Sequence, residues 1–235
     1  MAASRAALLF RGAGALLFLF SLAYFAYAYL TSFGRDPGVG NRLVAVTWDV
    51  MLFTGFAAHH SVFARERIRR IVANLLPPPL ERSAYVWVAS LLFLAVCAWW
   101  KPIAGQAWEA GSVLVWPLRL LQAAGVWLTL RSAAILNVRE LAGWQAKPAE
   151  LSSGDAEFKT AGPYGWVRHP IYSGWFLFVW AASPMTATRL VFAIVSCVYL
   201  IIAIPFEERT MRATGREAYE RYMTQVRWRL VPHLY

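Results

Sequence analysis

The sequence predicts an all-α fold, a polytopic integral membrane helical bundle of five to six transmembrane helices formed by a single domain over residues 1–235. Three observations lead to this prediction. Hydrophobic residues make up 59% of the chain and charged residues 15%, whereas soluble domains average about 45–50% and 25%. Long apolar runs with almost no charge recur along the chain. Tryptophan, tyrosine and basic residues gather at the ends of these runs, as they do at membrane–water interfaces.

Apolar runs dominate the N-terminal part, residues 12–136, which we expect to form N-terminal transmembrane helices. Residues 12–34 contain no charge, which matches the roughly 20 residues needed to span the hydrocarbon. No convincing cleavage site follows, so this run is predicted to be a retained helix rather than a signal peptide. The next runs cover residues 43–58, 83–100 and about 111–136.

The C-terminal part, residues 137–235, has a different organisation. A polar stretch, residues 137–168, precedes two closely spaced apolar stretches, residues 171–182 and 190–206. The first of these is short for an independent span, so we expect a C-terminal helical hairpin. From Glu207 to Tyr222 the chain turns amphipathic and then ends in a basic tail. This segment should lie at the membrane surface or fold back over it.

The net charge of +10 would indicate nucleic acid as the partner of a soluble protein. Here most lysines and arginines sit between apolar runs, where they set topology and contact anionic lipid headgroups. We therefore expect membrane lipid and no nucleic acid as a partner. Placing both termini in the cytoplasm puts most of the basic residues on the cytoplasmic side, as the positive-inside rule requires.

The sequence predicts neither a disulfide nor a metal site. Cys97 and Cys197 lie inside apolar stretches, where a cysteine behaves as a small hydrophobic residue. His59 and His60 are adjacent, and neighbouring residues on a helix point about 100° apart. No cysteine or carboxylate nearby completes a ligand set.

Residues 160–174 hold the densest cluster of unusual residues. Glycine and proline punctuate the approach to a helix and free backbone groups that water or a polar ligand can satisfy. Irregular backbone at membrane depth is tolerated only beside protein or a wet cavity. The alternative is an ordinary loop that enters a membrane helix, with Arg168 snorkelling and Tyr172 in the aromatic belt.

Two carboxylates, Glu207 and Glu208, directly follow the last charge-free run. Ionisable groups at this depth are costly unless paired or wet, and they indicate function. A carboxylate can hold the ribose hydroxyls or the ammonium group of a cofactor. The alternative is a solvated helix start, whose acids favour the helix dipole.

The order of these features carries a resemblance. Gly-Pro-Tyr at 162–164, Arg-His-Pro-x-Tyr-x-Gly at 168–174, an apolar hairpin, Glu-Glu, and then Gly215 with Tyr219 and Tyr222 follow one another. This pattern resembles the isoprenylcysteine carboxyl methyltransferase and phospholipid methyltransferase superfamily. His-Ser-Val-Phe-Ala-Arg at 60–65 and Glu-Arg-Ser-Ala-Tyr at 81–85 resemble its bacterial branch of methanethiol S-methyltransferases and NnrU-like membrane proteins. One departure is Val226-Arg227, where the family usually has Val-Pro.

The resemblance implies a methyltransferase that uses S-adenosylmethionine, in a bacterial inner (cytoplasmic) membrane. Residues 137–235 would then form the cofactor-binding core, with the cofactor enclosed between the last helices and the C-terminal segment. By motif position, the cofactor-binding residues would be Phe158, Lys159, Tyr164, His169, Pro170, Ile171, Tyr172, Glu207 and Glu208.

The methyl acceptor would be a small thiol, such as methanethiol, or a lipophilic molecule from the bilayer. The sulfonium methyl is already activated, so the protein must chiefly align the nucleophile and exclude water. A thiol acceptor needs a base or a positive field to form the thiolate. His60 and Arg168 are the catalytic candidates for this role, and Arg168 could also organise the loop. Residues 203–206 lack the arginine that contacts substrate in prenylcysteine enzymes, which disfavours a prenylcysteine acceptor.

Two alternative functions remain open at this point. The first is an NADPH-dependent membrane reductase, because membrane sterol reductases share a similar C-terminal pattern. The second is a non-enzymatic membrane accessory protein that retains the motif without turnover. The presence of His169, Tyr172 and both glutamates argues against the second alternative.

Overall fold

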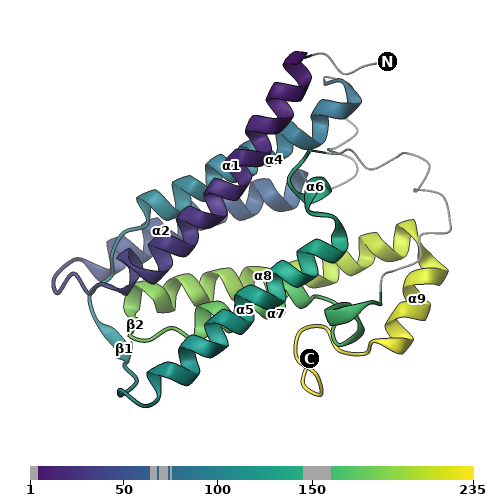
Figure 1. Cartoon of the computed structure of the whole chain (residues 1–235). Coiled ribbons are helices and arrows are strands. Elements are labelled where there is room, and N and C mark those ends of the chain that lie inside the picture. Colours follow the sequence, from purple (N-terminus) through teal and green to yellow (C-terminus); the bar gives the residue numbers. More distant parts are fainter. Residues whose placement is uncertain (1–4, 64–67, 69–73, 75, 145–159) are drawn as a thin grey trace. The chain divides into compact units, whose positions relative to one another are not determined.

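The computed structural model describes residues 5–63, 68, 74, 76–144 and 160–235. The chain divides into two compact units, each of which is described by itself. The first unit comprises Met1–Trp108, Arg139–Ala146 and Pro184–Val195. The second comprises Glu109–Val138, Lys147–Ser183 and Ser196–Tyr235. Both units are built mainly from α-helices (Figure 1).

Three long helices make up most of the first unit: α1 (Arg5–Leu30), α2 (Arg42–Phe63) and α4 (Pro78–Trp99). Helix α4 packs against both α1 and α2 (Figure 1). Proline at the first position of α4 is compatible with the helix, because the N–H groups of the first turn have no intrahelical partner.

Aromatic side chains form the centre of this unit. Phe192, from the first part of α8 (Ala187–Thr214), is fully buried. Its ring centroid lies 5.2 Å from that of Phe25, 5.8 Å from that of Tyr29 and 5.1 Å from that of Trp100. These contacts bury large apolar rings and so contribute strongly to the stability of the unit.

Arg189 is a buried charge that completes the end of α1. Its Nε donates to the carbonyl of Tyr29 at 2.9 Å, and its Nη2 donates to the carbonyl of Leu30 at 2.9 Å. The last carbonyls of a helix have no intrahelical partner and carry partial negative charge, so a guanidinium there satisfies both needs. Arg189 is therefore a structural cap of α1.

Short elements close the same end of the first unit. The 3₁₀ helix η1 (Ser32–Gly34) follows α1, and strand β1 (Gln106–Trp108) pairs antiparallel with β2 (Met185–Thr186). Asp49 of α2 is fully buried, and its Oδ1 accepts a hydrogen bond of 2.8 Å from the backbone N–H of Lys101.

The second unit contains α5 (Val115–Leu136), the 3₁₀ helix η3 (Gly162–Gly165), α7 (Pro170–Trp180), the rest of α8 and α9 (Arg216–Gln225). The four-residue α6 (Val138–Leu141) follows α5 at the boundary between the units. In the second unit α5 and α7 lie side by side (Figure 1).

Two glycines let α5 and α7 approach closely. A Cβ atom on Gly125 would lie 2.6 Å from the carbonyl oxygen of Gly174, and a Cβ on Gly174 would lie 2.6 Å from the carbonyl oxygen of Gly125. Neither position has room for a side chain. Gly174, the last residue of the Arg-His-Pro-x-Tyr-x-Gly motif, thus has a packing role, as small residues often do between membrane helices.

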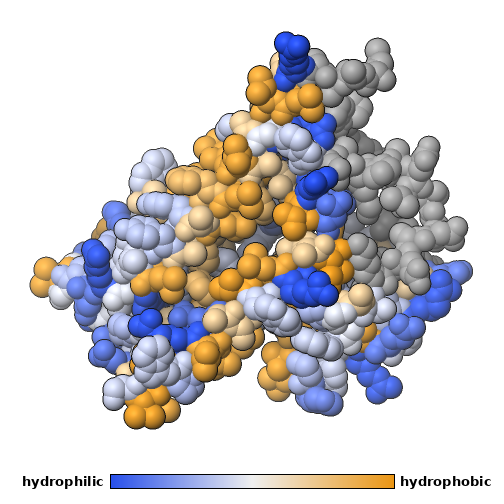
Figure 2. Space-filling model, in the orientation of Figure 1, coloured by the Kyte–Doolittle hydropathy of each residue, from blue (hydrophilic) through white to orange (hydrophobic). Residues whose placement is uncertain are grey.

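Within the part of the chain that the structure describes, three helical segments are long and apolar enough to cross a membrane: Arg5–Gly34, Leu80–Trp99 and Ala187–Ala213. Along α1, large apolar side chains such as Leu9, Leu16 and Phe20 are more than half exposed. Figure 2 shows hydrophobic residues over the visible face of this helix. Exposed apolar surface of this extent fits contact with lipid rather than water. The protein is a mainly helical integral membrane protein, as the sequence predicted.

The position of the two glutamates in their helix differs from the alternative considered in the sequence analysis. Helix α8 continues without interruption through Pro205, Glu207 and Glu208 to Thr214. The alternative that these acids begin a solvated helix is therefore wrong, because they lie well inside one. The amphipathic segment begins after Gly215, as the separate helix α9.

Candidate active site

The start of α7 positions the motif Arg168-His169-Pro170. His169 is the N-cap of α7, with φ −122°, and Pro170 is the first helical residue. Proline is well suited to that position, because its missing N–H would have no partner there and its fixed φ favours the helix. The sequence His-Pro thereby fixes where the helix begins and holds His169 just outside it, with 7% of its surface exposed.

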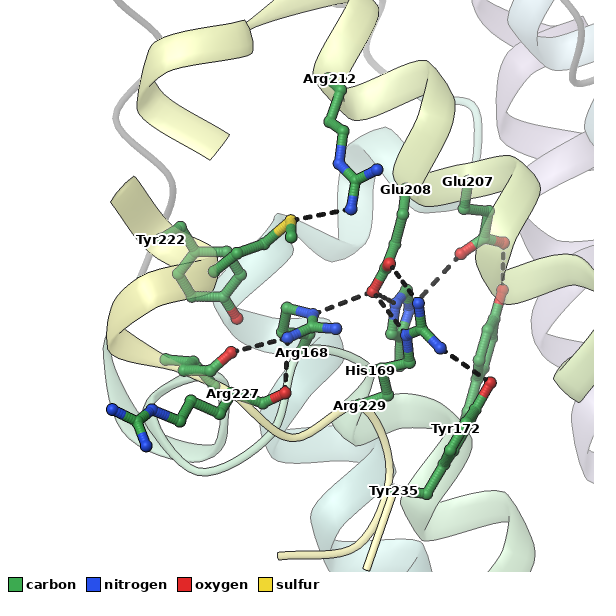
Figure 3. Close-up of polar contacts among 12 residues, drawn as sticks. Arg168, His169, Tyr172, Glu207, Glu208, Arg212, Tyr222, Arg227, Arg229 and Tyr235 are labelled. Atoms are coloured by element: carbon green, nitrogen blue, oxygen red, sulfur yellow. Dashed lines mark hydrogen bonds and ion pairs between the residues drawn. The ribbon is translucent and has the colours of Figure 1, made fainter. Parts of the chain in front are cut away.

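Glu208 is the centre of the charged network (Figure 3). Its side chain is 2% exposed. Its Oε1 accepts hydrogen bonds from Arg168 Nε at 2.9 Å and Arg229 Nε at 3.3 Å, and it lies 3.4 Å from His169 Nε2. Its Oε2 lies 3.2 Å from Arg229 Nη2. A carboxylate this deeply buried requires such partners to offset its lost hydration.

Glu207, the neighbouring residue, is in a different situation. Its side chain is 38% exposed. The hydroxyl of Tyr172 donates a hydrogen bond to Oε1, and His169 Nδ1 lies 3.6 Å from Oε2. The rings of His169 and Tyr172 stack, with centroids 5.5 Å apart and planes 12° apart. The imidazole of His169 therefore bridges the two glutamates, and Glu207 retains access to a ligand.

The C-terminal tail docks onto the motif through its main chain. The backbone N–H groups of Arg168 and His169 donate to the carbonyls of Trp228 and Arg229, each at 2.9 Å. The side-chain hydroxyl of Ser173 donates to the carbonyl of Leu230 at 2.6 Å. These bonds hold the tail beside the start of α7.

Arg168 strengthens the same connection. Its Nη1 donates to the carbonyl of Val226 at 2.9 Å and to that of Arg227 at 2.7 Å. Together with its bond to Glu208, these contacts link the loop before α7, helix α8 and the tail. The Val226-Arg227 departure from the family pattern thus falls where Arg168 binds backbone carbonyls, which any residue supplies.

Tyrosines of α9 secure this helix to the rest of the unit. Tyr219, Tyr222 and Val226 form a buried cluster, against which two methionines pack. The hydroxyl of Tyr222 donates to the carbonyl of Tyr164 at 2.8 Å. Burial raises the pKa of Tyr222 and of Tyr164, so both hydroxyls stay protonated at neutral pH.

Most of the predicted site residues come together in the second unit. One connected network contains Arg168, His169, Tyr172, Glu207 and Glu208. The remaining predicted residues of this unit flank the network: Tyr164 in η3, and Pro170 and Ile171 in the first turn of α7. Phe158 and Lys159 lie outside the described residues.

His60 belongs to the first unit, near the end of α2. Its Nδ1 lies 2.7 Å from the hydroxyl of Tyr85 in α4, and its ring stacks on Phe56 with centroids 5.7 Å apart. The guanidinium of Arg82 lies over the ring of Tyr85 at 5.3 Å. The imidazole of His60 is therefore held in one orientation by neighbours from two helices.

Sequence reasoning missed Arg229 and Ser173. Arg229 is one of several basic residues in the tail, where a solvated charge is the ordinary expectation, and nothing in its spacing distinguishes it from Arg227. Ser173 lies inside the motif, but a serine in a first helical turn is unremarkable by itself. The path of the tail across the start of α7 brings Arg229 to Glu208 and the carbonyl of Leu230 to Ser173.

The described residues contain no group of three or more His, Cys, Asp or Glu that could hold a metal ion. The charged network itself presents carboxylates, arginines, an imidazole and tyrosine hydroxyls. Fold and site together define a helical integral membrane protein with a charged site at the N-terminal end of α7, completed by Glu207 and Glu208 of α8.

Comparison with known proteins identifies the family. The family model described as phospholipid methyltransferase matches residues 119–216. The methanethiol S-methyltransferase of Crocosphaera subtropica is 36% identical over 191 residues, which is 78% of this chain and 74% of that protein. That of Mycobacterium tuberculosis is 35% identical over 193 residues, with 77% and 76% covered.

A third relative, methanethiol S-methyltransferase 2 of Bradyrhizobium diazoefficiens, is 32% identical over 224 residues, with 93% of this chain and 85% of that protein covered. No solved structure matches the chain. The chain belongs to the phospholipid methyltransferase family and is a membrane methyltransferase.

Proposed function

We propose that the protein transfers the methyl group of S-adenosylmethionine to a small thiol. The relatives at 32–36% identity are named for methanethiol, and they match over most of this chain. The observation that carries the proposal is the contrast between the two glutamates. Glu208 is committed to arginines, whereas Glu207 is held in place and remains 38% exposed.

The cofactor suits the groups that the network presents. The ammonium and ribose hydroxyls of S-adenosylmethionine are hydrogen-bond donors, which a partly exposed carboxylate accepts well. Glu207 would bind this polar end, and the stacked rings of His169 and Tyr172 would provide a flat surface beside it. Tyr164, Pro170 and Ile171 would complete the lining. Phe158 and Lys159 remain predicted contacts.

Glu208 and Arg168 would act one step further from the ligand. Glu208 holds Arg168 and Arg229 and lies near His169, so it supports the groups that would contact the cofactor. In this proposal residues 137–235 form the cofactor core and residues 12–136 form membrane helices.

The reaction requires a thiolate beside the cofactor. When bound, S-adenosylmethionine supplies an activated methyl group, so the residues of the protein need to position the thiol, exclude water and accept its proton. His60, oriented by Tyr85, is the proposed base. Arg168 would contribute positive charge.

We further infer five to six transmembrane helices in a bacterial inner membrane, and six, an even number, is the count that leaves both termini in the cytoplasm. Helices α2 and α5 have 22 residues each, a length of about 33 Å that is sufficient to cross the hydrocarbon. Each contains only two charged residues: Arg42 and Asp49 in α2, and Arg119 and Arg131 in α5. The C-terminal hairpin would be formed by α7 and α8.

Calorimetry on the detergent-purified protein tests this proposal. We expect S-adenosylhomocysteine to bind and NADPH not to bind, and we expect purified protein with S-adenosylmethionine and methanethiol to form the methyl thioether. Binding of NADPH alone would indicate the reductase alternative. Binding of neither compound would indicate an accessory protein. His60→Gln should lower turnover and leave the affinity for S-adenosylhomocysteine unchanged.

A further inference from the structure

Four charged residues of the second unit form a charge cluster: Arg168, Glu207, Glu208 and Arg229. They are connected by the contacts of Glu208 with both arginines and by the position of His169 between the glutamates (Figure 3). Two cations and two anions give the cluster a formal charge of zero. This balance depends on Arg229, a residue of the tail that the family motif does not include.

Arg229 contacts the carboxylate of Glu208 and offsets its negative charge. Its Nε and Nη2 approach both carboxylate oxygens, at 3.3 Å and 3.2 Å. Its Nη1 donates to the hydroxyl of Tyr235 at 3.2 Å, and its guanidinium lies 5.2 Å from the centroid of that ring. Burial, the largest single influence, lowers its pKa, but the contacts with Glu208 and Tyr235 together outweigh it, so the net shift is upward and Arg229 stays charged.

Arg168 and Arg229 differ in what else they hold. Arg168 approaches Oε1 of Glu208 and also binds the carbonyls of Val226 and Arg227. Replacing Arg168 would therefore release the tail as well as the carboxylate. Arg229 reaches Oε2 and contacts only its own segment besides Glu208, among the side-chain bonds of the described residues. Its charge can be removed with less disruption.

We propose that Arg229 is a positioning residue that sets the charge of the cofactor site and thereby its discrimination between the cationic methyl donor and the neutral product. This inference rests on the proposed function. S-adenosylmethionine carries a sulfonium charge that S-adenosylhomocysteine lacks, and the two compounds are otherwise matched in their polar groups. A site with zero net charge does not favour S-adenosylmethionine over S-adenosylhomocysteine by charge alone. The product can therefore be replaced by a new molecule of the donor after each turnover.

Removing Arg229 leaves the cluster with an extra negative charge in a partly buried place. A unit charge at about 10 Å in such surroundings changes the affinity for a cation by roughly tenfold. The affinity for a neutral ligand changes much less. The ratio of the two affinities therefore reports charge, whereas a general loss of structure would weaken both ligands together.

The experiment compares calorimetric affinities for S-adenosylmethionine and S-adenosylhomocysteine, without thiol, in charge-changing variants. Arg229→Gln should raise the affinity for S-adenosylmethionine, relative to that for S-adenosylhomocysteine, roughly tenfold. Glu208→Gln should shift this ratio in the opposite direction, and the double variant should return it to the wild-type value. Arg229→Lys, which keeps the charge, should leave the ratio unchanged. Arg221→Gln is the matched control, because Arg221 is exposed on α9.

Two results would overturn the inference. Arg229→Gln and Glu208→Gln could shift the ratio in the same direction, or Arg229→Gln could leave it at the wild-type value. If wild-type protein bound neither compound, the proposed function would fail first. If Arg229→Gln does not fold, Glu208→Gln and the double variant still decide, because the inference requires their ratios to differ.

Discussion

Glu207 and Glu208 are neighbours in sequence with different surroundings. Adjacent residues on a helix point about 100° apart, so one carboxylate faces Arg168 and the tail residue Arg229 while the other faces Tyr172. The sequence predicted that these two acids matter. It could not predict which one is committed, because Arg229 reaches Glu208 only through the path of the tail.

Tyr172→Phe tests the task assigned to Glu207. The hydroxyl of Tyr172 holds this carboxylate, and a hydrogen bond to a charged group contributes about 1.5–3 kcal/mol. We expect the affinity for S-adenosylhomocysteine to fall at least roughly tenfold, with little loss of thermal stability. Calorimetry measures the first quantity and a melting curve the second. Tyr27→Phe, at a side chain with 61% exposure, should change neither.

Tyr219, one of two buried tyrosines of α9, predicts an alkaline limit of stability. Burial, aided by the negative charge of Glu208, raises the pKa of Tyr219 from 10.0 to about 12. Between these values the unfolded chain releases a proton that the folded chain keeps, so the free energy of unfolding falls as pH rises. Below about pH 10 this contribution is fully present.

Melting temperatures at pH 9 and pH 11 measure this effect. The wild-type protein should lose stability between the two values, and Tyr219→Phe should lose less, because phenylalanine has no proton to release. Equal losses in the two proteins would show that Tyr219 is not the titrating group.

At the scale of the elements, the contact between α5 and α7 requires glycine at two positions. A Cβ atom on Gly125 would lie 2.6 Å from the carbonyl oxygen of Gly174, and the reverse distance is the same. Gly125→Ala must therefore separate the helices or bend them, at a cost of about 1–3 kcal/mol or more. Because Ile171 and Tyr172 lie in the first turn of α7, we also expect weaker cofactor binding.

Gly55→Ala is the matched control for this prediction. Gly55 lies within α2, and a Cβ there would meet nothing within 4 Å. Alanine at an unhindered helical position should stabilise the protein by roughly 0.5–1 kcal/mol. A melting curve for each variant makes the comparison, and a similar gain for Gly125→Ala would show that the helices have room to move.

The sequence predicted the helices better than their ends. Apolar runs at 12–34, 43–58 and 83–100 correspond to α1, α2 and α4, because a run long enough to span a membrane has few alternatives to a helix. The end of α8 was missed. Glu207 and Glu208 looked like the boundary of an apolar helix, but their partners from the tail and from α7 allow the helix to continue through them to Thr214.

At the scale of the whole molecule, two units share one chain in an interleaved order. The first unit includes residues from near residue 190 as well as the N-terminal helices. Sequence patterns gave no sign of this, because Phe192 and Arg189 find their partners in α1 only after the chain has folded. The aromatic core around Phe192 depends on contacts between residues far apart in sequence, which periodicity does not reveal.

The proposed orientation in the membrane yields a prediction for the whole chain. If both termini lie in the cytoplasm, as proposed, a fluorescent reporter that matures only there should be active at either end. A phosphatase reporter that requires the periplasm should be inactive at both. A phosphatase signal at one terminus would mean an odd number of spans. The same reporter after residue 109, between β1 and α5, should report the periplasmic side.

The way the tail docks affects which changes the family can accept during evolution. Arg168 and His169 bind carbonyl groups of Trp228 and Arg229, and every amino acid has a carbonyl group. Most tail side chains can therefore vary without moving the backbone. A deletion of one residue is a different matter, because it would place another side chain opposite Glu208 while the backbone bonds re-formed. We expect the tails of relatives to conserve length more strictly than composition.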